Sequence, residues 1–152
     1  GGGEGQEEFK HTDGYSRVAF GCDRLWLLKV ASLCSLPVPD EAWGALSRWF
    51  LDRPEADMFH AAFYDLVRQN VGEGLKGLLK VHKFCTRLHD AWSAEGPRAC
   101  NRGSAMRVCE AIRLKAEGER NGEWMRQFLG SHDGWKKLSR EVREATFRAR
   151  GG

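Results

Sequence analysis

Hydrophobic positions repeat with a helical period most clearly between residues 75 and 92. The repeat follows the i, i+3, i+4, i+7 spacing that places side chains on one face of a helix. Its members are Leu75, Leu78, Leu79, His82, Cys85, Leu88 and Trp92. The pattern predicts one amphipathic helix over residues 75–92. Such a helix needs other elements of the chain to cover its apolar face.

The rest of the chain reads as further helices, separated by proline and glycine. Apolar residues recur at spacings of three and four, and proline cannot continue a helical hydrogen-bond ladder. We expect seven helices in all, over residues 16–34, 41–51, 55–71, 75–92, 104–119, about 124–129, and from 131 or 133 to about 146. The expected N-caps are Asp40, Asp52 or Arg53, Ser104, and either Ser131 or Asp133. No stretch alternates polar and apolar residues for long enough to predict a strand.

The helices are expected to form antiparallel pairs. Pair starts at Ser16, Glu55 and Ser104 lie 39 and 49 residues apart, which is close to the armadillo/HEAT repeat of about 40–47 residues. The short Gly72-Glu73-Gly74 turn predicts that helix 75–92 lies antiparallel to helix 55–71. The predicted fold is therefore an all-α, armadillo/HEAT-like solenoid segment, with a compact helical bundle as the alternative. Residues 1–14 read as a flexible lead, and residues 15–150 as a single domain.

Composition is typical of an intracellular globular protein. The chain has 152 residues, of which 41% are hydrophobic and 30% charged, and no secretory signal opens it. Its five cysteines form an odd set without a C-x-x-C pair, which predicts reduced thiols used mainly as small core residues. They are Cys22, Cys34, Cys85, Cys100 and Cys109. We expect no membrane association and a cytoplasmic or nuclear location.

Charge is distributed unevenly along the chain. Residues 1–76 carry 8 basic and 12 acidic side chains (8 − 12 = −4), and residues 77–152 carry 16 and 9 (16 − 9 = +7). A basic half could bind an acidic protein or nucleic acid, although solvated helix faces are the simpler interpretation. The candidate partner contacts are Arg98, Arg102, Lys136, Lys137, Arg140 and Arg143.

Three potential metal ligands share the stripe of helix 75–92. His82, Cys85 and His89 stand at i, i+3 and i+7, and imidazole and thiolate are common zinc ligands. No second Cys/His cluster completes the set, so interior packing is the favoured interpretation.

A second metal hypothesis rests on a dipeptide. His89-Asp90 resembles the metal-binding pair of HD-type phosphohydrolases, and His60 and Asp133 could take the remaining roles. A two-residue match arises readily by chance, and a plain helix surface is favoured.

Cys100 is the one cysteine with basic neighbours, Arg98 and Arg102, which could make it more reactive than the others. No pattern of histidine and asparagine around it indicates a catalytic site. We therefore expect no catalytic residue, cofactor or metal in this chain.

Several blocks, taken in order, carry a family resemblance. They are Phe20-Gly21 with Arg24-Leu25 and Leu27-Leu28, Ala45-Leu46 through Phe50-Leu51, Met58-Phe59-His60, residues 78–92 ending Arg87-Leu88-His89-Asp90-Ala91-Trp92, Asn101-Arg102-Gly103, Arg107-Val108, Trp135, and Glu144-Ala145-Thr146. Over roughly residues 16–146 the chain resembles the C-terminal part of the SAPS domain, found in helical-repeat regulatory subunits of phosphatases of the protein phosphatase six type. The resemblance implies an armadillo/HEAT-like fold and a Ser/Thr phosphatase catalytic subunit as a partner.

The sequence thus predicts a non-enzymatic scaffold that binds other proteins through exposed charged and aromatic side chains. A helical domain that binds nucleic acid through the basic half is the main alternative. A metal-dependent hydrolase built on His82, Cys85 and His89 is a distant third.

Overall fold

The computed structural model describes residues 37–70, 72–118 and 122–151. Within these ranges all regular structure is helical and there is no strand, which confirms the all-α prediction for this part of the chain. The elements are α3 (Asp40–Asp52), α4 (Asp57–Gln69), a 3-10 turn η1 (Gly72–Leu75), a π turn η2 (Gly77–Val81), α5 (Phe84–Ser93), a 3-10 turn η3 (Gly96–Arg98), α6 (Arg102–Glu117), α7 (Gly122–Gly130) and α8 (Asp133–Ala149). The predicted lead, 1–14, and the predicted helix 16–34 lie outside the described residues.

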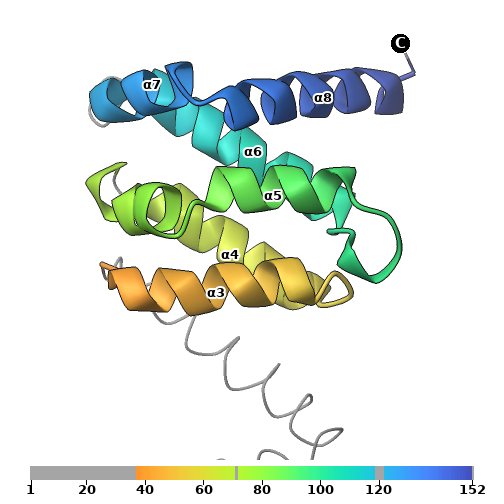
Figure 1. Cartoon of the computed structure of the whole chain (residues 1–152), viewed down its shortest axis with the longest axis horizontal. Helices are drawn as coiled ribbons and strands as arrows, with labels where there is room; N and C mark the ends of the chain where they lie inside the picture. Colours follow the sequence, from red (N-terminus) through yellow and green to blue (C-terminus); the bar gives the residue numbers. More distant parts are fainter. Residues whose placement is uncertain (1–36, 71, 119–121, 152) are drawn as a thin grey trace, which may run out of the picture.

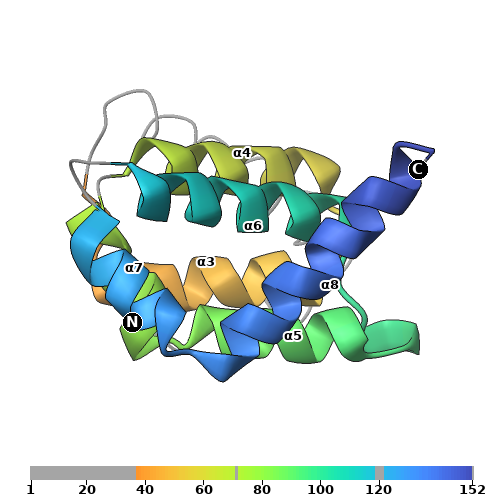
Figure 2. The ribbon, with the colours of Figure 1, turned by 90° about the horizontal axis from the view of Figure 1, so that it is seen from above.

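The described helices lie in three layers (Figure 1). α3 and α4 form the first layer, α5 and α6 the second, and α7 and α8 the third. Seen from above, α4 and α6 run together along one edge, and α3 and α5 along the other (Figure 2). α4 packs chiefly against α6, and α5 chiefly against α8. The prediction that helix 75–92 pairs with the preceding helix is therefore wrong, because η2 packs mainly against α3 instead.

Aromatic rings join the first two layers. Phe50 of α3 stacks on Phe63 of α4 with ring centroids 4.7 Å apart. Phe84 of α5 lies 5.7 Å from Phe63, and Trp43 meets Phe63 edge-on at 6.0 Å. All four side chains are buried. Aromatic pairs in such geometries add about 0.5–1.5 kcal/mol to the stabilisation from burial.

The predicted helix over residues 75–92 is not continuous. Its first part is the π turn η2, and α5 begins only at Phe84 after Lys83 adopts a left-handed conformation with φ of 51°. The predicted apolar stripe is nevertheless buried, except for the half-buried His82. Apolar periodicity predicts which side chains are buried. It does not exclude a break in the helix when the segments before and after the break both face the core.

α3 approaches the π turn closely at two glycines. A Cβ atom added to Gly44 would lie 2.5 Å from the His82 ring, and one added to Gly77 would collide with the Asp40 carboxylate and lie 3.0 Å from the Asp40 Cα. His82 Nε2 lies 2.7 Å from the Asp40 carbonyl oxygen. The missing Cβ atoms thus let the two backbones come close enough for this hydrogen bond.

The caps differ from the predicted ones. Asn101, not Ser104, caps α6 by accepting a hydrogen bond from the Ser104 N–H at 3.1 Å. His132, rather than Ser131 or Asp133, caps α8 through its Nδ1, which accepts from the Trp135 N–H at 2.9 Å. Asp40 is the first residue of α3, and Pro39 precedes it without a side-chain cap. Sequence rules name the residue types that cap well, but a cap also depends on the backbone path into the helix.

The close contact between α3 and the π turn predicts that a side chain at position 77 destabilises the protein. Gly77→Ala should lower the free energy of unfolding by about 1–3 kcal/mol, because overpacking forces the backbones apart. Gly130→Ala is the matched control: it is exposed, nothing lies within 4 Å of its added Cβ, and its stability should stay within about 0.5 kcal/mol of wild type or rise. Urea unfolding measures both. Equal stability of the two variants would contradict the proposed close contact.

His60 connects α4 to α6 inside the molecule. The side chain is buried, its Nδ1 lies 2.8 Å from the Ser104 Oγ, and its ring lies 4.6 Å from that of Phe50. Burial lowers the pKa of His60 below its ordinary value of 6.5, and nearby Asp57 and Glu55 offset this only in part. The folded protein therefore holds a neutral imidazole where the unfolded chain would take up a proton.

Stability should consequently fall as the pH drops below 6.5, since the unfolded state binds the His60 proton before the folded state does. The measurement is the free energy of urea unfolding about one pH unit above and one below this value. His60→Gln should show a smaller loss over the same interval, because the titrating group is gone. An unchanged loss in that variant would assign the effect to other groups.

Candidate partner-binding groove

A cleft of about 460 Å³ opens between α6, the end of α7, and α8. Its walls mix apolar and charged side chains, and most of the charged ones are basic. The lining residues are Arg113, Ala116, Glu117, Leu129, Gly130, Trp135, Lys136, Ser139, Arg140, Arg143 and Glu144. Leu129 and Trp135 are buried and supply an apolar base.

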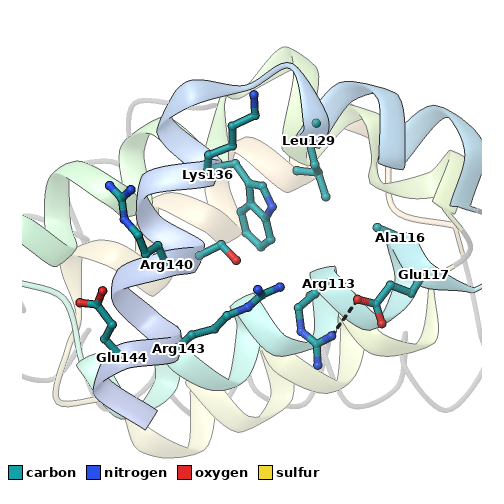
Figure 3. Close-up of a pocket in the computed structure, with 11 residues that line it drawn as sticks. Arg113, Ala116, Glu117, Leu129, Lys136, Arg140, Arg143 and Glu144 are labelled. Atoms are coloured by element: carbon teal, nitrogen blue, oxygen red, sulfur yellow. Dashed lines mark hydrogen bonds and ion pairs between the residues drawn. The ribbon is translucent and has the colours of Figure 1, made fainter. Parts of the chain in front are cut away.

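Two arginines face one another across this cleft (Figure 3). Arg143 reaches in from α8 toward Arg113 on α6. Arg113 is paired along its own helix, with Nε 3.1 Å from Glu110 Oε2 and Nη1 2.8 Å from Glu117 Oε1. Arg143 has no hydrogen bond or ion pair with any residue in the described ranges. In Arg143 the cleft therefore contains an inward-pointing guanidinium fork with free donors beside an apolar base.

A second hollow of about 560 Å³ continues along α8 on the other side of these arginines. Arg113 and Arg143 line both spaces, and the second is bounded by Tyr64, Met106, Arg107, Glu110, Val142, Thr146, Phe147 and Arg150. We call the two spaces together the α6–α8 groove. Phe147 leaves 67% of its surface exposed at the second hollow. A large exposed aromatic beside a hollow is typical of an interaction surface.

The acidic residues of the groove are already neutralised in part. The hydrogen bond from Arg113 lowers the pKa of Glu110, and the nearby charges of Arg143 and Arg150 lower it further. The carboxylate of Glu110 thus stays ionised well below neutral pH. The groove mixes acidic and basic side chains, and Arg143, Lys136 and Arg140 have side-chain donors without a partner among the described residues.

The predicted partner contacts are only partly brought together. Lys136, Arg140 and Arg143 line the first hollow, but the ends of Lys136 and Arg140 turn toward its outside while Arg143 points inward (Figure 3). Lys137 is exposed on α8 and lines neither hollow. Arg98 is exposed in η3, away from the groove lining.

Arg102 holds its own loop in place. Its guanidinium carbon lies 4.7 Å from the centre of the Trp92 ring, and its Nη2 donates to the Trp92 carbonyl oxygen at 3.1 Å. The side chain thus ties the start of α6 to the end of α5. Arg102 lines neither hollow of the groove.

Arg113 and Phe147 are groove residues that sequence reasoning missed. Arg113 follows the inward Ile112 on α6 and reads as a solvated residue there. Phe147 comes after the last inward position predicted for α8. An aromatic residue beyond the end of an apolar stripe was the one available signal, because such a side chain has no place in the predicted core.

The potential zinc ligands do not share one helical face. His82 ends the π turn and contacts Asp40, whereas Cys85 is fully buried in α5 and its pKa is raised to about 12 by burial. His89 Nε2 faces Glu141 of α8 at 3.8 Å. Across residues 37–70, 72–118 and 122–151, no three His, Cys, Asp or Glu side chains form a group that could hold a metal ion.

The other residues of the second metal hypothesis have separate surroundings. His60 is bonded to Ser104 between α4 and α6, whereas Asp133 is exposed in the first turn of α8. The His89-Asp90 dipeptide lies on α5, with Asp90 exposed.

Cys100 is a buried thiol. It is 7% exposed, and burial raises its pKa, an effect that the neighbouring Arg102 only partly offsets. Its N–H donates to the Ala91 carbonyl oxygen at 3.1 Å. Cys100 is still the most exposed of the three described cysteines, and burial raises the pKa of Cys85 to about 12, so the expectation that Cys100 is more reactive than the others stays a prediction. Cys85 and Cys109 are buried as well, as predicted for core thiols.

Comparison of the chain with known protein families, with curated proteins and with solved structures gives no match. The resemblance to the SAPS domain therefore stays a prediction. Among the described helices, none has the length and apolar character needed to cross a membrane.

Protection of the Cys100 thiol from alkylation tests whether this side chain is buried. Cys100 in the native protein should react with iodoacetamide at least about tenfold more slowly than in urea, because its thiolate population and its access are both low. Peptide mapping by mass spectrometry resolves this site from Cys22 and Cys34. Native Cys100 labelled as fast as in urea would contradict its burial.

Proposed function

We propose that this protein is a non-catalytic scaffold that binds a protein partner in the α6–α8 groove. Stacked pairs of helices, in an armadillo/HEAT-like arrangement, present such grooves without a catalytic centre. The three layers of helices and the position of the groove on the last layer support this proposal. A compact bundle with the same groove would serve the same function.

One observation carries the proposal. Arg143 extends over an apolar base without a hydrogen-bonding partner among the described residues, and the exposed Phe147 stands one turn further along α8. Arginine and aromatic side chains contribute most strongly to binding where a partner excludes water from them. The pair has the composition of a small binding centre within a charged rim.

The sequence resemblance suggests one partner to test first, the catalytic subunit of a Ser/Thr phosphatase of the six type. The lining of the groove does not select this catalytic subunit over other proteins. Any protein that offers a complementary acidic and apolar surface fits the proposal equally well.

Nucleic acid is the alternative partner. The basic second half of the chain favours it, but Glu110, Glu117 and Glu144 line the same groove. A phosphate backbone passing along α8 would meet these carboxylates. A protein partner can place neutral or basic groups opposite them, and we therefore favour protein binding.

A comparative pull-down from the native cell tests the function. Proteins retained by the wild-type chain should be lost at least about tenfold with Arg143→Glu, since reversing a charge that a partner contacts costs more than the roughly 1.5–3 kcal/mol of a hydrogen bond to a charged group. Lys137→Glu is the matched control, with the same charge change on the same helix outside the groove. It should retain the same proteins as the wild type.

Two outcomes would contradict the proposal. Equal retention by the wild type and Arg143→Glu would exclude the groove as the binding site. Strong heparin binding that falls steeply with salt and is lost with Arg143→Glu would assign the groove to nucleic acid.

A further inference from the structure

The groove has a repeating composition along α8. The hollow based on Leu129 and Trp135 comes first, the Arg113–Arg143 pair, which lines both hollows, follows, and the hollow at Phe147 comes last. Apolar side chains therefore lie on either side of a basic centre, within walls that also carry charged side chains. A complementary occupant would present apolar, acidic and apolar side chains in a row.

The spacing of the hollows selects the conformation of that occupant. α8 contributes Trp135 to Glu144 to the first hollow and Val142 to Arg150 to the second, so their midpoints along the helix are 139.5 and 146. At about 1.5 Å of rise per residue, these midpoints lie about 10 Å apart. Residues i and i+7 of an α-helix are separated by about 10.5 Å and share one face. In an extended strand, two side chains on one face lie about 6.6 or about 13 Å apart, and the separation along α8 is closer to the helical i, i+7 spacing than to either.

Charge decides the kind of anion. Arg143 offers one guanidinium without a hydrogen-bonded partner in the described chain, while Arg113 is shared between Glu110 and Glu117. The ends of Lys136 and Arg140 turn outward (Figure 3), Arg107 lies over the Tyr64 ring at 5.0 Å, and Arg150 follows the end of α8. The single inward fork of Arg143 matches one carboxylate in a bidentate pair. A phosphate group carries about −1.5 to −2 at neutral pH, and its additional charge would meet Glu110 and Glu117.

We propose that the α6–α8 groove binds an amphipathic helix of a partner protein, with apolar residues at i and i+7 and a carboxylate at i+3 or i+4 that pairs with Arg143. The inference rests on the proposed function and specifies its partner. The apolar residues enter the two hollows, and the acidic residue crosses between them. This is the helix-in-groove mode of recognition, with anchors at helical spacing.

Selection of displayed peptides on the full chain tests this directly. Random peptides of about 16 residues are long enough to form a helix on binding. The selected sequences should share two apolar residues seven apart, with Asp or Glu three or four residues after the first. A consensus with alternating spacing, a consensus without an acidic residue, or no enrichment would overturn the inference.

The selected peptide then becomes the probe in fluorescence anisotropy. Arg143→Gln and Phe147→Ser should each weaken its binding at least tenfold, and Lys137→Gln should leave it unchanged; circular dichroism verifies that every variant is folded. Changing the peptide acid to its amide should weaken binding to wild type but not to Arg143→Gln, which identifies the pair by a double-mutant cycle. Equal losses against both proteins would overturn the assigned contact.

Two competitors complete the test. A phosphoserine in place of the peptide acid should bind more weakly, and tighter binding would overturn the choice of carboxylate. A DNA oligonucleotide that displaces the peptide with a steep salt dependence would overturn the choice of a protein helix. The pull-down distinguishes a failure of this inference from a failure of the proposed function. Partners whose retention depends on Arg143 support the groove as a binding site even if the peptide consensus contradicts a helical occupant.

Discussion

The buried ring of Phe63 is the contact on which the rest of the structure depends. Phe50 from α3, Phe84 from α5 and Trp43 from α3 all meet it, so one side chain of α4 joins two layers. Removing a buried phenylalanine ring costs about 3–5 kcal/mol, a large share of the roughly 5–15 kcal/mol that stabilises a domain. Without this centre, α5 and α6 would lose the layer beneath them.

The groove between α6 and α8 depends on these aromatic contacts, because they hold the lower layers together. α8 packs chiefly on α5, and α6 packs chiefly on α4. The two walls of the groove are therefore supported by different helices of the lower layers. Trp135, Leu138 and Val142 face inward from α8, and Arg143 and Phe147 lie on the side that faces α6. The distance between the walls is therefore determined by the lower layers. A groove lined by exposed side chains thus depends on aromatic rings buried in the layers below it.

Much of this arrangement was visible in the apolar pattern, and its failures have physical reasons. The stripe from Leu75 to Trp92 correctly identified buried positions but concealed the break at Lys83, since both turns bury the same kind of residue. Arg143, predicted as a partner contact, lines the groove. Arg102, predicted as another, lies over the Trp92 ring, a contact that is invisible until the loop is folded.

The sequence by itself determined that the described chain is helical, where most helices lie, and which side chains leave water. These properties depend on local spacing, and local spacing is encoded directly. Only the tertiary structure decided that α4 packs on α6, that Cys100 is buried despite its basic neighbours, and that Arg113 and Arg143 face each other across 30 positions of sequence. Apolar periodicity states that a face must be covered, but any other apolar face can cover it. The choice among partners is made by shape, by close approaches such as those at Gly44 and Gly77, and by the paths of the turns.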